Sequence, residues 1–195
     1  MYILGLTCYA HESTCSLIKD GKIICVIEEE RLNREKHTWR YPKLAIQECL
    51  DIGSITIDDI DHITYFWKPW KEITGNIYHM LRYFPASLNL LRSESGGNSL
   101  LFVRRFIMMM NVGKKIKEQF NLKRKPKIIF VEHHLAHAAS AFFVSPYSDA
   151  AILTFDGRGE STSTMLSYGQ NNTITKIKEV KVPHSLGHLY SAITD

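Results

Sequence analysis

Residues 3–22, ILGLTCYAHESTCSLIKDGK, and residues 151–170, AILTFDGRGESTSTMLSYGQ, can be laid over each other at a constant offset without a gap. In both stretches an apolar segment leads into a polar tip, a second apolar segment and a turn. Glu12-Ser13-Thr14 falls on Glu160-Ser161-Thr162, and Gly21 falls on Gly169. Because strand, tip, strand and turn recur in the same order, the sequence predicts a duplicated hairpin unit and therefore two similar lobes.

The remaining pattern predicts an α/β protein. Apolar runs predict strands at 2–7, 15–18, 22–27, 63–67, 127–131, 150–155, 163–167 and 173–182. Helical patterns cover 42–53, then 69–125 with a break at 93–98, then 133–143. Asp20-Gly21 is a hairpin signal, and residues 28–37 are predicted to form a charged turn.

Two lobes that each aim a hairpin tip inward are typical of the actin-like ATPase (ribonuclease H-like) fold, in which the tips hold nucleotide phosphates. We therefore expect a first lobe over 1–145, with a helical insertion at about 69–125 and a histidine helix at 133–143. Residues 146–195 are expected to begin a second lobe that is truncated, so the chain is interpreted as a fragment or a split gene product.

Both hairpin tips carry candidate ligand-binding groups. In Asp156-Gly157-Arg158-Gly159-Glu160-Ser161, the glycines let backbone N–H groups approach phosphate, the hydroxyl donates, and the acids can hold a metal ion. A tight hairpin without a ligand explains these residues about as well. In His11-Glu12-Ser13 the imidazole offers acid, base or oxyanion-donor chemistry, and a solvated turn is the alternative.

A histidine cluster indicates a metal site. In Glu132-His133-His134-Leu135-Ala136-His137, His133 and His137 lie four apart on one helical face, within reach of a single ion, while His134 points about a quarter turn away. Neutral imidazole pairs suit iron or zinc. Two ligands are too few for a stable site, and the sequence identifies no third; a helix start with buried histidines is the alternative interpretation.

Composition excludes several classes of protein. With 45% hydrophobic and 23% charged residues, no apolar run of about 18 residues and no signal peptide, the chain is expected to be cytoplasmic with no membrane partner. A net charge of +4 is too small to indicate nucleic acid, and the basic stretch 104–127 is predicted to be the solvated face of an amphipathic helix. The four cysteines, without a Cys-x-x-Cys pair, are predicted to be small buried hydrophobes.

Five motifs occur in order over nearly the whole chain: Gly5-Leu6 with His11-Glu12-Ser13, Glu28-Glu29-Glu30-Arg31 with Lys36-His37, the block 132–142, Asp156-Gly157-Arg158-Gly159-Glu160, and the segment 183–192, PHSLGHLYSA. Together they resemble the N-terminal part of the O-carbamoyltransferases of nodulation-factor and antibiotic biosynthesis. More remotely, the chain is similar to the tRNA threonylcarbamoyl-adenosine modification proteins, which share the two lobes and a metal-binding histidine pair.

This resemblance implies that carbamoyl phosphate and ATP yield a carbamoyl-adenylate, whose carbamoyl carbon is attacked by the hydroxyl of a small-molecule acceptor. It implies Fe(II) or another divalent metal ion on His133 and His137, and ATP bound with Mg2+. His11 and Glu12 would be catalytic. The nucleotide or carbamoyl-adenylate would be bound by Ser13, Asp156, Gly157, Gly159, Glu160 and Ser161.

Members of that family are longer. They carry the rest of the second lobe, a further metal-ligand aspartate, an adenosine-binding segment and a YrdC-like domain that makes the adenylate, which are expected from the same or an adjacent gene. The chain alone is expected to be incomplete for catalysis. Two other functions fit the same fold: a sugar or acyl kinase, and a non-catalytic nucleotide-binding fragment. The histidine pair favours the carbamoyltransferase, because kinases of this fold use a carboxylate base.

Overall fold

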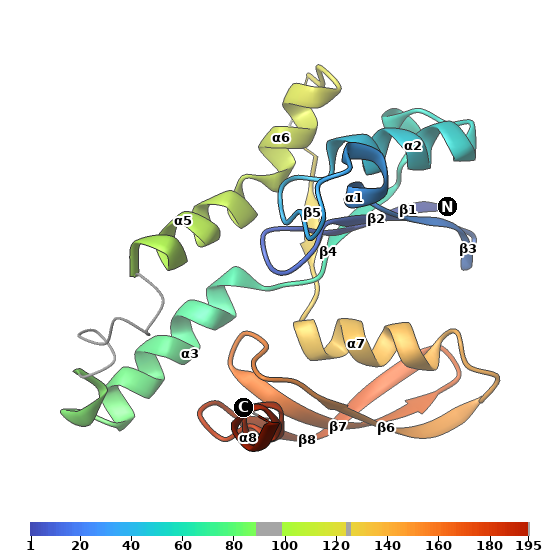
Figure 1. Ribbon diagram of the computed structural model, residues 1–195. Helices are drawn as coiled ribbons and strands as arrows, with labels where there is room; N and C mark the ends of the chain where they lie inside the picture. The colour runs from blue at the N-terminus through green and yellow to red at the C-terminus, as the bar shows by residue number, and fades with distance from the viewer. Residues whose placement is uncertain (89–98, 124–125, 195) are drawn as a thin grey trace. The chain divides into compact units, whose positions relative to one another are not determined.

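The computed structural model describes residues 1–88, 99–123 and 126–194, and it is an α/β structure (Figure 1). The chain divides into two compact units. The first unit is Met1–Phe66 with Glu94–Phe130, and the second unit is Trp67–Ser93 with Val131–Asp195. Each unit has its own sheet.

The sheet of the first unit has five strands in the order β3-β2-β1-β4-β5. Strands β1 (Tyr2–Thr7), β2 (Thr14–Lys19) and β3 (Lys22–Glu28) form an antiparallel meander. Strands β4 (His62–Tyr65) and β5 (Ile128–Phe130) extend it in parallel. Asp20 and Gly21 both have positive φ, 47° and 80°, as the predicted two-residue hairpin requires.

Four helices of the first unit lie in the described residues: α1 (Glu29–Asn33), α2 (Lys43–Gly53), α5 (Ser99–Met110) and α6 (Val112–Gln119). A 3-10 turn covers Ile57–Asp59. Helix α2 packs on β2 and β3, with Ile46 and Leu50 buried. The predicted charged turn at 28–37 is wrong in part, because α1 occupies its first half.

The amphipathic pattern of the basic stretch is confirmed where the structure describes it. Met109, Val112 and Ile116 are buried, while Lys114 and Lys117 are exposed. The break expected at 93–98 lies outside the described residues. All four cysteines are free thiols; three of them are buried, as predicted, and Cys25 is half-buried.

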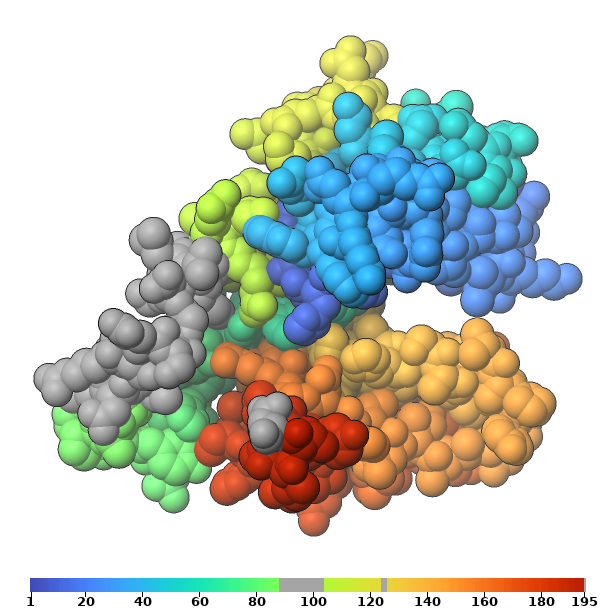
Figure 2. Space-filling model, in the orientation of Figure 1, coloured from blue at the N-terminus to red at the C-terminus, as the bar shows by residue number. Residues whose placement is uncertain are grey.

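The sheet of the second unit is an antiparallel meander of β6 (Asp149–Phe155), β7 (Thr162–Gln170) and β8 (Thr173–Lys181). Helix α7 (His133–Phe142) packs on β6 and β7. The other elements are α3 (Pro69–Arg82), the 3-10 turn Ala86–Leu88 and α8 (Leu186–Thr194), which lies at the surface (red in Figure 2).

A small core joins α7 to this sheet. Ala138 and Phe142 of α7 pack against Ile152 of β6 and Met165 of β7. A Cβ on Gly169 would lie 2.7 Å from the Phe142 ring, which is too close for a side chain. The ring therefore packs over the strand in the space that Gly169 leaves open. Phe142 thereby fixes how closely α7 approaches the sheet.

The predicted duplication is present as two three-stranded meanders, but the pairing registers differ. In the first meander Leu4 pairs with Leu17. The predicted overlay would pair Ile152 with Met165, whereas Ile152 pairs with Ser167. The second tip, residues 156–163, is therefore two residues longer than the first, residues 8–13. Because side chains alternate with a period of two, this difference keeps the same residues on the inner face.

The compact units do not follow the predicted lobe boundary at residue 145. Helix α7 belongs with the second sheet, and the predicted insertion is divided, with α3 in the second unit and α5 and α6 in the first. The lobe assignment itself stays a prediction. In the described ranges, none of the helices is both long and apolar enough to cross a bilayer.

Candidate metal centre

Helix α7 presents two of the candidate ligands. Its alanine-rich sequence favours a helix, which begins directly at His133 after the extended residue Glu132 and ends at Phe142. Four residues make a little more than one turn, so His133 and His137 project from the same face. The helix therefore brings the two predicted ligands together.

A third donor follows the first strand of the second sheet. Asp156 comes directly after β6, at the start of the long tip. The backbone N–H groups of Asp156 and Gly159 donate to the carbonyls of Ser163 (2.9 Å) and Thr162 (2.8 Å), which closes the tip. The Gly157 N–H donates to Asp156 Oδ1 at 2.6 Å. Asp156 Oδ2 is thereby left facing α7.

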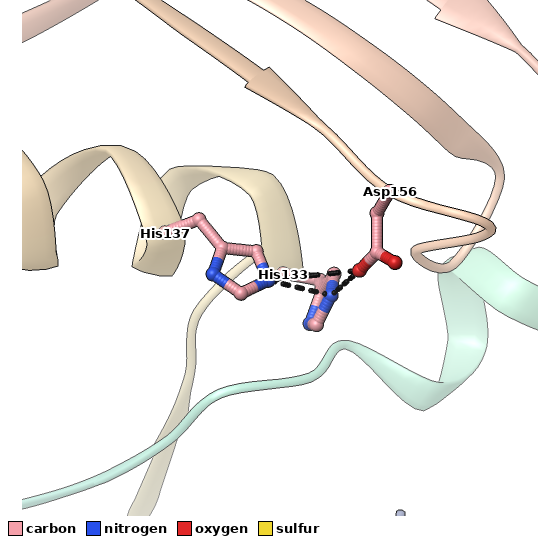
Figure 3. Close-up of side chains that lie close together, drawn as sticks. All are labelled: His133, His137 and Asp156. Atoms are coloured by element: carbon pink, nitrogen blue, oxygen red, sulfur yellow. Dashed lines mark hydrogen bonds and ion pairs between the residues drawn. The ribbon is translucent and has the colours of Figure 1, made fainter. Parts of the chain in front are cut away.

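The three side chains point toward one another (Figure 3). His133 Nε2 lies 2.8 Å from Asp156 Oδ2 and 3.0 Å from His137 Nε2. His137 Nε2 lies 3.6 Å from the same carboxylate oxygen. In the described part of the chain, this is the one group of three or more histidine, cysteine and acidic side chains placed to share an ion.

These distances fit a divalent metal ion. Donors bound at about 2.1 Å to one ion, at right angles to one another, lie about 3.0 Å apart. The three measured separations, 2.8, 3.0 and 3.6 Å, scatter around that spacing. Two imidazoles and one carboxylate form the donor set typical of non-haem Fe(II) sites, and zinc accepts the same ligands.

The charge state of the site suits a cation. Burial lowers the pKa of His133 to about 4, although the nearby Asp156 carboxylate opposes this shift. Burial would raise the pKa of Asp156, but hydrogen bonds from His133 and the Gly157 N–H keep it below its ordinary value. At neutral pH the site therefore offers a neutral imidazole and an ionised carboxylate, which are the forms that bind metal.

The sequence alone names no third donor and assigns Asp156 to nucleotide binding. The structure adds Asp156 to the histidine pair because α7 packs on β6, the strand that Asp156 follows. The local signals are the position of Asp156 at the end of a strand and its carboxylate, a group that can hold a metal ion. Which helix packs on that strand is a tertiary fact that the spacing of residues does not contain.

His134 is a structural residue, as its predicted orientation indicates. Its Nδ1 lies 2.8 Å from Thr154 Oγ1, and its Nε2 lies 3.0 Å from the Thr162 carbonyl. The carbonyl can only accept, so Nε2 carries the proton and Nδ1 accepts from the Thr154 hydroxyl. The neutral His134 ring thus links α7 to the edge strand β6 and to the central strand β7.

Glu160 and Gly159, two of the predicted nucleotide-binding residues, are buried. Glu160 Oε1 accepts the backbone N–H groups of Lys68 (2.8 Å) and His133 (3.0 Å). Burial raises the pKa of Glu160 and these N–H groups oppose the rise. Gly157 and Ser161 are half-buried, and Ser161 contacts α3 at Gly75, where a Cβ would lie 2.5 Å from the serine Cβ.

A cluster of lysines surrounds the residue before α7. Glu132 Oε1 lies 2.8 Å from Lys71 Nζ and 3.3 Å from Lys68 Nζ, and Oε2 lies 2.5 Å from Lys176 Nζ. Burial alone would raise the pKa of Glu132, but hydrogen bonds from Lys176 and Lys71 outweigh it and lower the pKa to about 2. The start of α7 is thereby tied to α3 and β8.

The remaining predicted residues, His11, Glu12 and Ser13, belong to the first unit. His11 and Glu12 are exposed, and Glu12 Oε1 lies 3.5 Å from His37 Nδ1. Ser13 is buried; its hydroxyl donates to the Arg40 carbonyl and its own carbonyl accepts the Glu29 N–H at 2.9 Å. These contacts place the tip of the first hairpin against the segment after α1.

The fold and the site thus define an α/β chain in which two imidazoles and a carboxylate, placed so that they could hold a metal ion, converge beside a sheet. The comparison with known families is more specific. The family model described as the carbamoyltransferase N-terminus matches residues 2–195. The chain belongs to this family.

Two relatives support the assignment. The uncharacterized protein sll1178 of Synechocystis is 38% identical over 195 residues, 99% of this chain and 31% of that protein. The nodulation protein NolNO of Sinorhizobium fredii is 33% identical over 184 residues, 93% of this chain and 25% of that protein. The chain thus spans less than a third of the length of these relatives.

Solved structures show weaker likeness. YeaZ from Pseudomonas aeruginosa is 12% identical with a TM-score of 0.46, over 93% of this chain and 67% of that one. The Aquifex aeolicus Ppx/GppA phosphatase is 12% identical with a TM-score of 0.42, over 98% and 55% of the two chains. Scores below 0.5 do not establish a shared fold.

Proposed function

We propose that the chain is the N-terminal part of an ATP-dependent O-carbamoyltransferase. In this proposal a carbamoyl group passes from carbamoyl phosphate, through a carbamoyl-adenylate, to a hydroxyl of a small-molecule acceptor. Membership of the carbamoyltransferase N-terminal family supports the reaction class. The observation that carries the proposal is the convergence of His133, His137 and Asp156.

His133, His137 and Asp156 would hold Fe(II) or another divalent ion. Such an ion supplies a positive charge that polarises a carbonyl or phosphoryl oxygen. The chain's own part is to present a neutral His133 imidazole and an ionised Asp156 carboxylate, with the Trp67 ring packed against the His133 ring at a centroid distance of 4.9 Å. The histidine pair also favours this function over a kinase, which needs no imidazole pair.

ATP with Mg2+ would be bound through the tip that starts at Asp156. The half-buried Gly157 and Ser161 are the better placed of the predicted contacts, and His11 and Glu12, which are exposed, stay the catalytic candidates. An actin-like fold, with the rest of its second lobe and a YrdC-like domain in the same or an adjacent gene product, would complete the site. The relatives' greater length supports this part of the proposal.

The test measures metal content and carbamoyl transfer in this chain produced together with the proposed remainder of the second lobe and the YrdC-like domain. We expect about one iron per chain, lost in His133→Ala/His137→Ala together with transfer of carbamoyl from labelled carbamoyl phosphate. His62→Ala/His184→Ala removes two exposed imidazoles and serves as the matched control. Equal iron in the wild type and the His133/His137 variant would overturn the proposal.

A further inference from the structure

One buried carboxylate joins three segments of the second unit. Glu160 is only 4% exposed, and its Oε1 accepts the N–H of Lys68 at 2.8 Å and the N–H of His133 at 3.0 Å. Lys68 is the residue that caps the start of α3, and His133 is the first residue of α7. Glu160 itself lies on the tip, four residues after Asp156.

The donors are groups that a helix start leaves unsatisfied. The first N–H groups of a helix have no partner within the helix, and the helix dipole favours negative charge there. The α7 start has no side-chain cap from its own N-cap residue, Glu132. A carboxylate from elsewhere in the sequence therefore satisfies the His133 N–H and holds the start of α7 against the tip.

The same contact reaches two of the candidate metal donors. His133 supplies both the N–H that Glu160 accepts and the Nε2 atom that lies 2.8 Å from Asp156 Oδ2. Lys68 follows Trp67, whose ring packs on the His133 ring. Glu160 thus links the His133 backbone and the segment that carries the Trp67 ring to the tip that carries Asp156.

We propose that Glu160 is a positioning residue, which sets the spacing between His133 and Asp156 through backbone hydrogen bonds rather than by touching a ligand. This inference rests on the metal site of the proposed function. It also assigns Glu160 a role different from the nucleotide contact that the family resemblance implies.

The test is a Co2+ titration of the full chain, in which visible absorption reports the ligand geometry and the titration curve gives the affinity. Glu160→Ala removes the acceptor, so we expect about 10–100-fold weaker Co2+ binding and a changed absorption band, as for other groups that orient metal ligands. Glu160→Gln keeps a carbonyl oxygen that can accept both N–H groups. We expect it to restore affinity to within about fivefold of the wild type.

The chain supplies a matched control in Glu29. This carboxylate is also 4% exposed and accepts the N–H groups of Leu44 (3.2 Å) and Ala45 (2.7 Å) in the first turn of α2, in the first unit. Glu29→Ala should lower stability but change Co2+ affinity by less than about twofold. An equal loss of affinity in Glu29→Ala would show general destabilisation and overturn the inference.

Wild-type affinity and absorption in Glu160→Ala would also overturn it. If that variant does not fold, Glu160→Asp is compared with Glu160→Gln: the aspartate keeps the charge but withdraws the oxygen, so it should lose affinity while glutamine retains it. The opposite order contradicts the inference. Failure of the proposed function is distinct, because then the wild type and His133→Ala/His137→Ala bind Co2+ alike.

Discussion

At the scale of single residues, the tip lies so close to His133 and His134 at Gly159 that a side chain there would crowd both rings. A Cβ at this position would lie 3.0 Å from His134 Cδ2 and from the Thr162 carbonyl oxygen, and 3.3 Å from His133 Cδ2. Both rings are held by hydrogen bonds, and the carbonyl belongs to β7. A glycine at this point therefore lets the tip lie directly against the start of α7.

We expect Gly159→Ala to displace the His133 ring by a few tenths of an ångström and to weaken Co2+ binding by about tenfold. Gly157→Ala is the control, because the atoms nearest to its Cβ belong to the exposed His188 ring, at 3.3 Å, which can move aside. Co2+ titration of both variants checks this. Equal affinities would show that the rings have more freedom than the contacts indicate.

At the scale of elements, α7 is attached to its sheet by a polar clamp and an apolar one. His134 bonds to Thr154 of β6 and to the Thr162 carbonyl of β7, while Phe142 fills the space over Gly169 at the other end. The two contacts lie at opposite ends of the helix. Together they fix its position over both strands.

We expect His134→Phe to cost about 1–3 kcal/mol of unfolding free energy, because the Thr154 hydroxyl and the Thr162 carbonyl each lose their buried hydrogen bond to the ring, although the carbonyl keeps the Gly159 N–H. Metal stoichiometry at saturating Co2+ should stay unchanged, in contrast to His133→Ala/His137→Ala. Urea unfolding and Co2+ titration give the two readouts. Loss of stoichiometric binding would mean that His134 belongs to the metal site.

Most elements follow from local patterns. The alternating residues in β1 and β2, the Asp20-Gly21 turn and the alanine-rich run of α7 are each enough to predict their element from the local sequence. Helix α1 is missed because its charged residues lack an apolar stripe; the buried Glu29 side chain, which caps α2, stabilises it instead. That capping contact joins two elements and leaves no periodic signal.

At the scale of the whole molecule, the sequence predicts two meanders and the histidine pair but not the third donor. The overlay of residues 3–22 on 151–170 places Asp156 on the second tip, yet it gives the wrong register by two residues. The packing of α7 on β6 brings Asp156 to the histidines. Burial of Glu160 has the same origin, since only the assembled unit encloses its side chain.

Acid should destabilise the second unit in metal-free protein. Burial lowers the pKa of His133 from 6.5 to about 4. Between these two pH values the unfolded state binds a proton at this imidazole and the folded state does not. The free energy of unfolding is therefore unaffected by this group above about pH 6.5, and it falls by at most about 3 kcal/mol as the pH drops toward 4. Glu132, with a pKa of about 2, adds a further loss below about pH 4.5.

The measurement is urea unfolding between pH 7 and 4 in the presence of a chelator, followed by the fluorescence of the tryptophans. Trp67 lies against His133 and reports on the second unit. His133→Gln has no titrating ring, so its stability should vary less over this range. An equally steep fall in that variant would assign the pH dependence to other groups.

The even length difference between the two tips has a consequence for tolerated insertions and deletions. Removing Arg158 alone would rotate every later β7 side chain to the opposite side, sending Met165 into solvent and Leu166 inward. Deleting two neighbouring residues of the tip would leave the β7 side chains on their present faces and remove only functional groups of the tip. We therefore expect this tip to accept a change of two residues in its length more readily than a change of one.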